Sequence, residues 1–380
     1  MTEYENDRTF APPEHLAGLI AEYGTPLWVL DPGGLRRRYR ELKDFFAWNP
    51  GYSQWLPLCR LRHTGLLRIL AREGCGAVCE SGSQLRLAQE AGFPPERILF
   101  APLCPSWAEM ALAAELGTQV GVDSPLVVDC MAEVGFVPQN VGLCLWMGPG
   151  KSEDSSPTLP GMDRCALLTQ AARLAAMGVR ELGLMAQGES CGQGALEQRA
   201  KRLLPIVEDV RALTGLTVSW LDVDGGGVLG QTPPQTPRSQ SLWLRRILGP
   251  VPELNVRTRF DDWLVAPAAL LLTGVVGVKE GGRTFAFLDA GPACFCGGTA
   301  QAGRHHVSKL GDRRVEDRNS YFLALCRPEG EQLPARRRVL PPLRKGDALV
   351  FHDMGLHLAE MDGGRAVMYS DDADDGAQDP

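Results

Sequence analysis

Short apolar runs recur at intervals of roughly 20 to 40 residues through the first two thirds of the chain. Longer segments with helical periodicity follow most of them; in 83–91, 106–116 and 163–177 apolar residues repeat at three and four. The runs themselves are 55–58, 76–79, 98–102, 119–122, 141–146, 181–185, 218–223 and 255–260. Alternating strands and helices favour parallel strands with right-handed crossovers, so eight such units predict a closed (β/α)8 TIM barrel.

The pattern changes after about residue 265, where β-rich runs replace the alternation. Residues 270–291 form two such runs around a Glu-Gly-Gly turn, which predicts a hairpin. Further strands are expected at 320–326, 347–352 and 365–369, whereas 152–162 and 231–240 are expected to be loop insertions.

We therefore expect an α/β chain in which a TIM barrel precedes a β-rich C-terminal domain. Residues 31–264 would form the barrel and 265–369 the β-domain, on which an N-terminal segment, 1–30, would pack. Residues 370–380 are rich in aspartate and have little apolar surface to bury, so they are expected to be a disordered acidic tail. A length of 380 residues suits two hydrophobic cores.

The amino-acid composition argues against several classes of function. A net charge of −7 with dispersed arginines lacks the basic surface of a nucleic-acid-binding protein. No apolar run approaches the roughly 20 residues that span a bilayer, which argues against a membrane role. The acidic N-terminal segment does not resemble a signal peptide, so we expect a cytoplasmic protein. The eleven cysteines form no CxxC pair, which favours reduced thiols.

Several motifs occur in a fixed order along nearly the whole chain. Two of them are Leu221-Asp-Val-Asp-Gly-Gly-Gly227 and Leu288-Asp-Ala-Gly291; the others are 23–31, 74–85, 91–100, 122–124 and 345–351, and no single motif is decisive. Their order and spacing resemble the fold-type III pyridoxal phosphate decarboxylases, which include the ornithine and diaminopimelate decarboxylases and share an alanine racemase-type barrel. The resemblance implies a small-molecule substrate derived from an amino acid, and a homodimer with its active site near the interface.

The chain departs from this family at its cofactor lysine. In the family that lysine ends the first barrel strand, seven residues before a Leu-Leu pair, and counting back from Leu66-Leu67 leads to Cys59. Only an amine can condense with the cofactor aldehyde and later release it, so the sequence predicts a divergent member without a pyridoxal phosphate Schiff base.

Other family positions are changed as well. The resemblance places Gln187 where a histidine stacks on the cofactor ring, and Arg259 where a carboxylate pairs with the ring nitrogen. It also places Val78 at an aspartate, Cys144 at an arginine and His357 at a tyrosine that reaches the phosphate. These polar residues are candidates for binding a cofactor or, for His357, for catalysis.

Some family features are retained. Gly225, Gly226 and Gly227, together with Ser190, are candidates for cradling a phosphate through backbone amides and a hydroxyl. A turn that needs positive φ would explain the glycines equally well. Cys326 matches the cysteine that the family supplies across its dimer interface, although a buried cysteine at a strand end is a comparable explanation.

We favour a repurposed enzyme, because the lost residues became Cys, Gln, Arg and His, and unpaired buried polar groups cost about 1 to 3 kcal/mol each. Cys59 would then be the axial ligand of a substitute cofactor such as haem, with Arg60 and Arg62 binding its propionates. Alternatively, those arginines would lower the pKa of Cys59 and make it a nucleophile.

Two further interpretations stay open. The chain would be a catalytically silent homologue that binds a small molecule or regulates a partner. Otherwise it would be a pyridoxal phosphate-dependent decarboxylase with a relocated lysine, Lys151, which alone among the six lysines follows a barrel strand at its carboxyl end. The sequence leaves the cofactor, the substrate and the reaction open.

Overall fold

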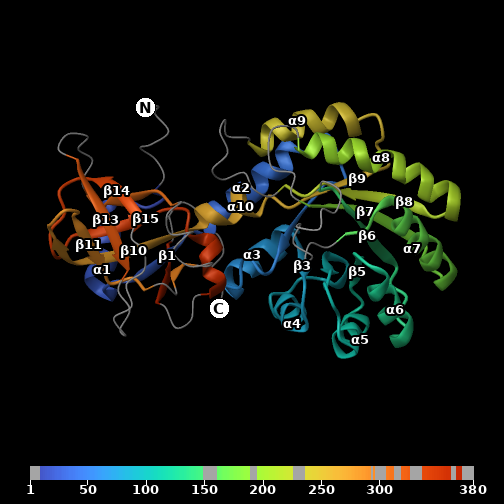
Figure 1. Cartoon of the computed structure of the whole chain (residues 1–380), viewed down its shortest axis with the longest axis horizontal. Coiled ribbons are helices and arrows are strands. Elements are labelled where there is room, and N and C mark those ends of the chain that lie inside the picture. Colours follow the sequence, from blue (N-terminus) through green and yellow to red (C-terminus); the bar gives the residue numbers. More distant parts are fainter. Residues whose placement is uncertain are drawn as a thin grey trace. The chain divides into compact units, whose positions relative to one another are not determined.

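A computed structural model describes residues 9–148, 161–188, 195–225, 236–291, 294–295, 305–311, 318–325, 336–360 and 365–369 (Figure 1). The chain divides into two compact units, here called the barrel unit (38–59 and 64–263) and the β unit (1–37, 60–63 and 264–380). Within the described residues, no helix combines the length and the apolar character needed to cross a membrane.

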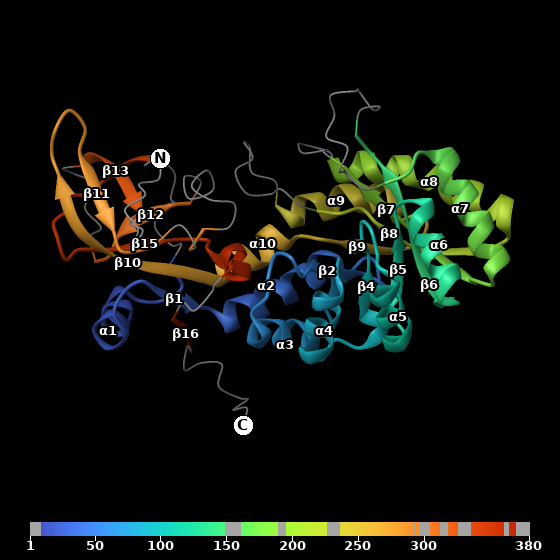
Figure 2. The same ribbon diagram turned by 60° about the horizontal axis from the view of Figure 1, so that its bottom comes forward.

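Eight parallel strands close the barrel unit, which confirms the predicted fold class. They are β2 (Ser53–Pro57), β3 (Gly76–Cys79), β4 (Ile98–Phe100), β5 (Gln119–Val122), β6 (Asn140–Trp146), β7 (Glu181–Gln187), β8 (Thr217–Asp222) and β9 (Asn255–Thr258). Three of them, β3, β4 and β5, are buried along their whole length and the others at all but one or two positions, as expected for strands with a packed barrel interior on one face and helices on the other (Figure 2).

Helices follow the strands in sequence, after α2 (Pro32–Phe45). They are α3 (Thr64–Glu73), α4 (Gly82–Glu90), α5 (Trp107–Leu116), α6 (Pro125–Val134), α7 (Arg164–Met177), α8 (Ala195–Thr214) and α9 (Pro237–Leu248), with the 3-10 turn η2 (Pro95–Arg97) before β4. Local signals fix their ends: Ser106 and Glu109 form a capping box on α5, and Gly117 ends that helix with φ 69°.

The loop predicted at 231–240 is wrong for its last residues. The hydroxyl of Thr236 caps α9 by accepting a hydrogen bond from Ser239 N, and Pro237 occupies the first turn. Residues 226–235 and 149–160 lie outside the described residues. At the end of the other predicted insertion, Met162 forms a parallel bridge with Leu145.

Two tryptophans and one arginine pack together in the interior of the barrel. Gly183 makes room for Trp220, because a Cβ atom there would lie 2.0 Å from the indole. The Arg257 guanidinium lies 3.6 Å from the Trp220 ring centroid and 4.4 Å from that of Trp55, and it donates to Gln119 Oε1 at 2.9 Å. Burial lowers the pKa of Arg257 to about 9. The interior of the barrel therefore contains a cation held between two aromatic rings.

Two buried amide side chains complete the seam between β2 and β9, where only two pairs of Cα partners occur. Gln54 Oε1 accepts from Thr258 Oγ1 at 2.9 Å and from Phe260 N at 3.2 Å. Asn49 donates to Leu254 O at 2.9 Å and accepts from Val256 N at 3.1 Å. Side chains thus supply hydrogen bonds that the short strand ladder lacks.

The β unit is a mixed sheet in the order β12-β15-β10-β11-β13-β14, with β1 paired to β10 and β16. Its elements are α1 (Pro13–Tyr23), β1 (Leu27–Leu30), α10 (Asp261–Val265, which begins in the barrel unit), η3 (Ala266–Ala268), β10 (Ala269–Lys279), β11 (Phe285–Leu288), β12 (Val307–Lys309), β13 (Asn319–Leu325), β14 (Arg336–Leu340), β15 (Ala348–Phe351), η5 (Gly355–Glu360) and β16 (Ala366–Met368). β10 and β11 form the predicted antiparallel hairpin.

Asp289, in the motif at 288–291, joins three segments of the β unit through its carboxylate. Its Oδ1 accepts hydrogen bonds from Thr273 Oγ1 at 2.6 Å and from Gly274 N at 2.9 Å, while Oδ2 accepts from Thr25 Oγ1. The carboxylate therefore ties β10 to the end of β11 and to the segment before β1, which is a structural role.

We expect Gln54→Leu to destabilise the barrel unit by roughly 2 to 4 kcal/mol, because the buried Phe260 amide and Thr258 hydroxyl lose their acceptor. Denaturant unfolding followed by tryptophan fluorescence measures the change. Gln89→Leu, at an exposed position on α4, is the matched control and should change stability by less than about 0.5 kcal/mol. Equal stabilities of the two variants would contradict the role given to Gln54.

Candidate functional site

The carboxyl ends of the barrel strands are where active sites of this architecture lie. Leu58 N donates to Val78 O at 2.9 Å and prolongs the β2 pairing by one residue, so the partly buried Cys59 stands at that end of the barrel. Arg60 and Arg62, which belong to the β unit, have exposed side chains. The strand end thus presents a thiol and no amine.

A buried ion pair joins the ends of β8 and β9. Arg259 Nε and Nη2 lie 2.8 and 2.7 Å from Asp222 Oδ2, and the two side chains are 10% and 1% exposed. Burial by itself would lower the pKa of Arg259, but the carboxylates of Asp222 and Asp224 outweigh it and raise the pKa. The cation at this position is therefore permanent, and it is neutralised within the barrel.

The backbone turns sharply immediately after β8. Asp224 has φ 63°, a conformation that aspartate tolerates better than most residues, and its Oδ1 accepts from Gly225 N at 2.8 Å. Positive φ thus falls on Asp224, one residue before the described glycine of the triplet. Gly225 is required for another reason, since a Cβ atom there would lie 2.9 Å from the Phe260 ring. Its close packing supports the structural explanation of this glycine.

Cys144 lies in the barrel's hydrophobic interior with Trp55, Val78, Leu99, Met185 and Trp220. Burial raises the pKa of this thiol to about 12, although Arg259 acts in the opposite direction. Cys144 is therefore a protonated core thiol at neutral pH. Gln187, at the end of β7, is partly buried and is the Cα partner of Trp146.

Sequence reasoning missed two polar groups at this end of the barrel. Asp123 follows β5 and is partly buried, so burial raises its pKa, while Ser124 Oγ donates to its Oδ1 at 2.9 Å. Arg199 of α8 lies 3.0 Å from Asp224 Oδ2. The motif around 122–124 signalled the first of these. Nothing in the helical periodicity of α8 signalled the second.

His357 forms a hydrogen-bonded pair with His305 in the β unit, with their Nε2 atoms 2.7 Å apart. His305 Nδ1 lies 3.0 Å from His352 O, and because a carbonyl only accepts, this nitrogen carries the proton of neutral His305. His357 Nε2 is then the donor to His305. Burial, followed by His305 and Arg60, lowers the pKa of His357 to about 3. At neutral pH, His357 is therefore an uncharged donor.

Four of the predicted site residues lie outside the described residues: Ser190, Gly226, Gly227 and Cys326. Lys151 does so as well. Among the residues that the structure does describe, no group of three or more His, Cys, Asp or Glu side chains is arranged to hold a metal ion.

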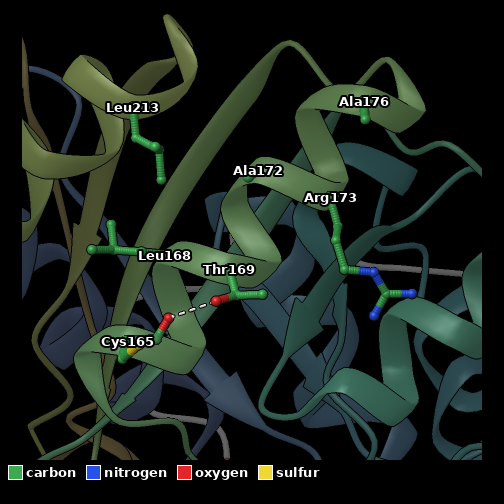
Figure 3. Close-up of a pocket in the computed structure, with 7 residues that line it drawn as sticks. All are labelled: Cys165, Leu168, Thr169, Ala172, Arg173, Ala176 and Leu213. Carbon is green, nitrogen blue, oxygen red and sulfur yellow. Dashed lines mark hydrogen bonds between the residues drawn. The ribbon is translucent and has the colours of Figure 1, made fainter.

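A hollow of about 570 Å³ lies away from the strand ends, along the exposed face of α7 and against Leu213 of α8 (Figure 3). Its main polar contact is internal, since Thr169 Oγ1 donates to the Cys165 carbonyl at 3.0 Å. The hollow contains none of the predicted site residues.

Comparison with known proteins gives consistent results. Residues 33–158 match the family model described as pyridoxal-dependent decarboxylase, pyridoxal binding domain. The diaminopimelate decarboxylase of Methanothermobacter thermautotrophicus is 26% identical over 90% of this chain and 84% of its own length, and that of Streptomyces coelicolor is 28% identical over 91% and 83%. The structure of diaminopimelate decarboxylase from M. jannaschii with L-lysine superimposes with a TM-score of 0.79, at 19% identity, over 94% of this chain and 90% of that one.

These relatives overturn the function that we favoured from the sequence. Similarity to diaminopimelate decarboxylases extends over about 90% of the chain, and the matching family model is that of a pyridoxal-binding domain. The hypothesis of an enzyme that works without a pyridoxal phosphate Schiff base, with Cys59 as haem ligand or nucleophile, is therefore wrong. The substituted positions are few, whereas the similarity to these enzymes runs through almost the whole chain.

The His305–His357 pair predicts a pH dependence of stability. The pKa of His357 is about 3 in the folded protein and near 6.5 when exposed, so the unfolded chain binds more protons between these values. The stability that neutral His357 contributes is complete above about pH 6.5 and is lost as the pH falls towards about 3.

Denaturant unfolding at about pH 7 and about pH 4.5 measures this loss, which His357→Leu should reduce. His15→Leu, at an exposed position on α1, is the control and should keep the wild-type loss. The same pH dependence in both variants would rule out His357 as the titrating group.

Proposed function

Since the chain belongs to the fold-type III family of pyridoxal-dependent decarboxylases, we propose that it is a pyridoxal phosphate-dependent amino-acid decarboxylase in which Lys151 binds the cofactor. Its substrate is an amino acid of the diaminopimelate class. The observation that carries this proposal is the similarity to diaminopimelate decarboxylases over about 90% of the chain.

The described residues do not fit the cofactor in the way the resemblance implies. Cys59 stands where the family's lysine is expected, and the described lysines of the barrel unit, Lys43 and Lys201, are exposed on α2 and α8. Arg259 stands where a carboxylate would pair with a protonated ring nitrogen, which its charge would repel. We therefore derive no chemical step through the cofactor, and its use depends on Lys151.

Oppositely charged side chains are paired at the carboxyl ends of the barrel strands. Asp222 neutralises Arg259, and Arg199 neutralises Asp224. Asp123 adds a partly buried carboxyl, whose pKa burial raises while a hydrogen bond from Ser124 acts in the opposite direction. We propose further that the active protein is a cytoplasmic homodimer, in which Cys326 belongs to the site near the interface.

A second candidate is a catalytically silent homologue that binds a small molecule or regulates a partner. The observation that favours it is the buried Asp222–Arg259 ion pair, which places opposite charges against each other where β8 and β9 end. Such a protein would keep the family's fold and lack an amine able to reach the cofactor.

Borohydride reduction in the presence of pyridoxal phosphate, followed by peptide mass spectrometry, tests the first candidate. We expect a pyridoxyl adduct on Lys151 and its loss in Lys151→Ala. Lys201→Ala is the control and should leave the adduct unchanged, because Lys201 is exposed and pairs with Glu197 on its own helix. An unmodified Lys151 would reject the relocated lysine and leave the silent homologue.

Cys59→Lys tests whether the rest of the site still accommodates the cofactor. The position lies at the carboxyl end of β2, so we expect the introduced amine to be trapped by borohydride in higher yield than Lys151 of the wild type. Cys104→Lys, at an exposed position, is the control for non-specific labelling. Equal labelling of the two variants would show that the barrel mouth no longer holds pyridoxal phosphate.

A further inference from the structure

Four of the chain's six histidines form two ring pairs in the β unit. His305 and His306 precede β12, His352 follows β15, and His357 lies in η5. The ring centroids of His305 and His357 are 4.7 Å apart, and those of His306 and His352 are 5.0 Å apart. The two histidines that are adjacent in sequence therefore face different partners.

The first pair has the geometry of two ligands that converge on one point. The Nε2 atoms of His305 and His357 lie 2.7 Å apart, and the ring planes are inclined by 68°, so the rings are not stacked. Two imidazole nitrogens bound to one ion at about 2.0 to 2.1 Å, with an angle of about 90° to 110° at the metal, would lie roughly 2.9 to 3.4 Å apart. A slight separation of the two rings would therefore let an ion replace the hydrogen bond.

Both rings are oriented by contacts that leave Nε2 directed at the pair. His305 Nδ1 donates to His352 O at 3.0 Å, and a hydrogen bond from the other ring nitrogen to a backbone carbonyl is the usual support of a metal-binding histidine. His357 N donates to Met354 O at 2.9 Å, and its ring packs against the buried Phe295. Neutral His357 would carry its proton on Nδ1 when Nε2 binds an ion, so no proton needs to leave.

The surroundings allow access but disfavour very tight binding. His305 is partly exposed, whereas His357 is 5% exposed, so an ion would approach from the side of His305. Asp353 lies close enough to His305 to favour a positive charge there, whereas Arg338 and Arg60 disfavour one.

The second pair lacks this arrangement and serves as a comparison. His352 Nε2 lies 2.8 Å from Ser308 Oγ, so this nitrogen is directed at a hydroxyl group and away from the His306 ring. His306 thus has the same chemistry and nearly the same place in the chain as His305, without a converging partner nitrogen.

We propose that His305 and His357 form a binding site for a divalent transition-metal ion, with water completing the coordination. Two protein ligands are fewer than structural metal sites have, so the ion would exchange with solvent. Imidazole suits Cu²⁺, Ni²⁺ and Zn²⁺, and Cu²⁺ should bind most tightly of the three. The site belongs to the β unit and is independent of the proposed decarboxylase activity.

Calorimetric titration with Ni²⁺, after alkylation of the exposed thiols of Cys104 and Cys165, measures the affinity. We expect binding to be at least about tenfold weaker in His305→Phe and in His357→Phe, because each variant loses one of two protein ligands. His306→Phe is the matched control and should bind as the wild type does. Equal affinities of the three variants, or a wild type that binds no Ni²⁺, would overturn the proposal and leave the pair as a hydrogen bond only.

Thermal unfolding shows whether the ion binds the folded protein. An ion that binds the native state alone raises the midpoint of unfolding, so Ni²⁺ should raise it in the wild type and in His306→Phe. The rise should be absent in His305→Phe and His357→Phe. A rise of the same size in these two variants would place the ion elsewhere and reject the site.

A measurement on the wild type covers the case in which the two variants do not fold. Modification by diethyl pyrocarbonate, followed by peptide mass spectrometry, reports which histidine nitrogens are engaged. Ni²⁺ should slow the modification of His305 by about fivefold or more and leave that of His15, which is exposed on α1, unchanged. Absence of protection at His305, or equal protection of both residues, would contradict the proposed site.

Discussion

The seam between β2 and β9 is the contact on which the candidate site depends. Closure makes the first and last barrel strands neighbours, and the buried amides of Gln54 and Asn49 provide hydrogen bonds that the two-pair ladder lacks. Cys59 follows one of these strands and Arg259 the other. Two positions that depart from the family's pattern therefore follow the two strands that this seam joins.

Charge compensation explains why the altered site remains polar. An arginine at the end of β9 would be costly in a closed barrel, but Asp222 lies 2.7 Å away and Asp224 adds a second carboxylate. Asp224 in turn requires Arg199, whose side chain is almost fully buried. Arg259 and Asp222 are both buried, so replacing either one alone would leave the other without its ion-pair partner, and we expect the two positions to change together. The arginine at position 259 is thus explained by its ion pair with Asp222, and no separate function is needed for it.

The eight barrel strands could be predicted because buried parallel strands leave continuous apolar runs, and helix ends such as Ser106 and Gly117 have local signals. The start of α9 was missed because the cap at Thr236 is surrounded by residues typical of loops. Site contacts were less predictable. Arg199 looks like any helical arginine until the fold brings it to Asp224, and Cys144, a candidate for binding a cofactor, packs in the core. The sequence predicts which strand carries a residue, whereas the strand register and the alternation of side chains between the two faces decide what that side chain contacts.

The substitution at Cys59 alone does not decide whether the protein uses the family's cofactor. Absence of an amine after β2 is a local fact, whereas similarity to diaminopimelate decarboxylases extends through both the barrel and the β-rich region. A local change can remove one chemical step without altering the rest of the site, so it does not identify a new cofactor. Haem would have required a set of replacements that create a cavity and an axial ligand. Among the described replacements, Arg259 is paired with Asp222 and Cys144 is a protonated thiol packed in the core, and neither arrangement is that of an axial ligand.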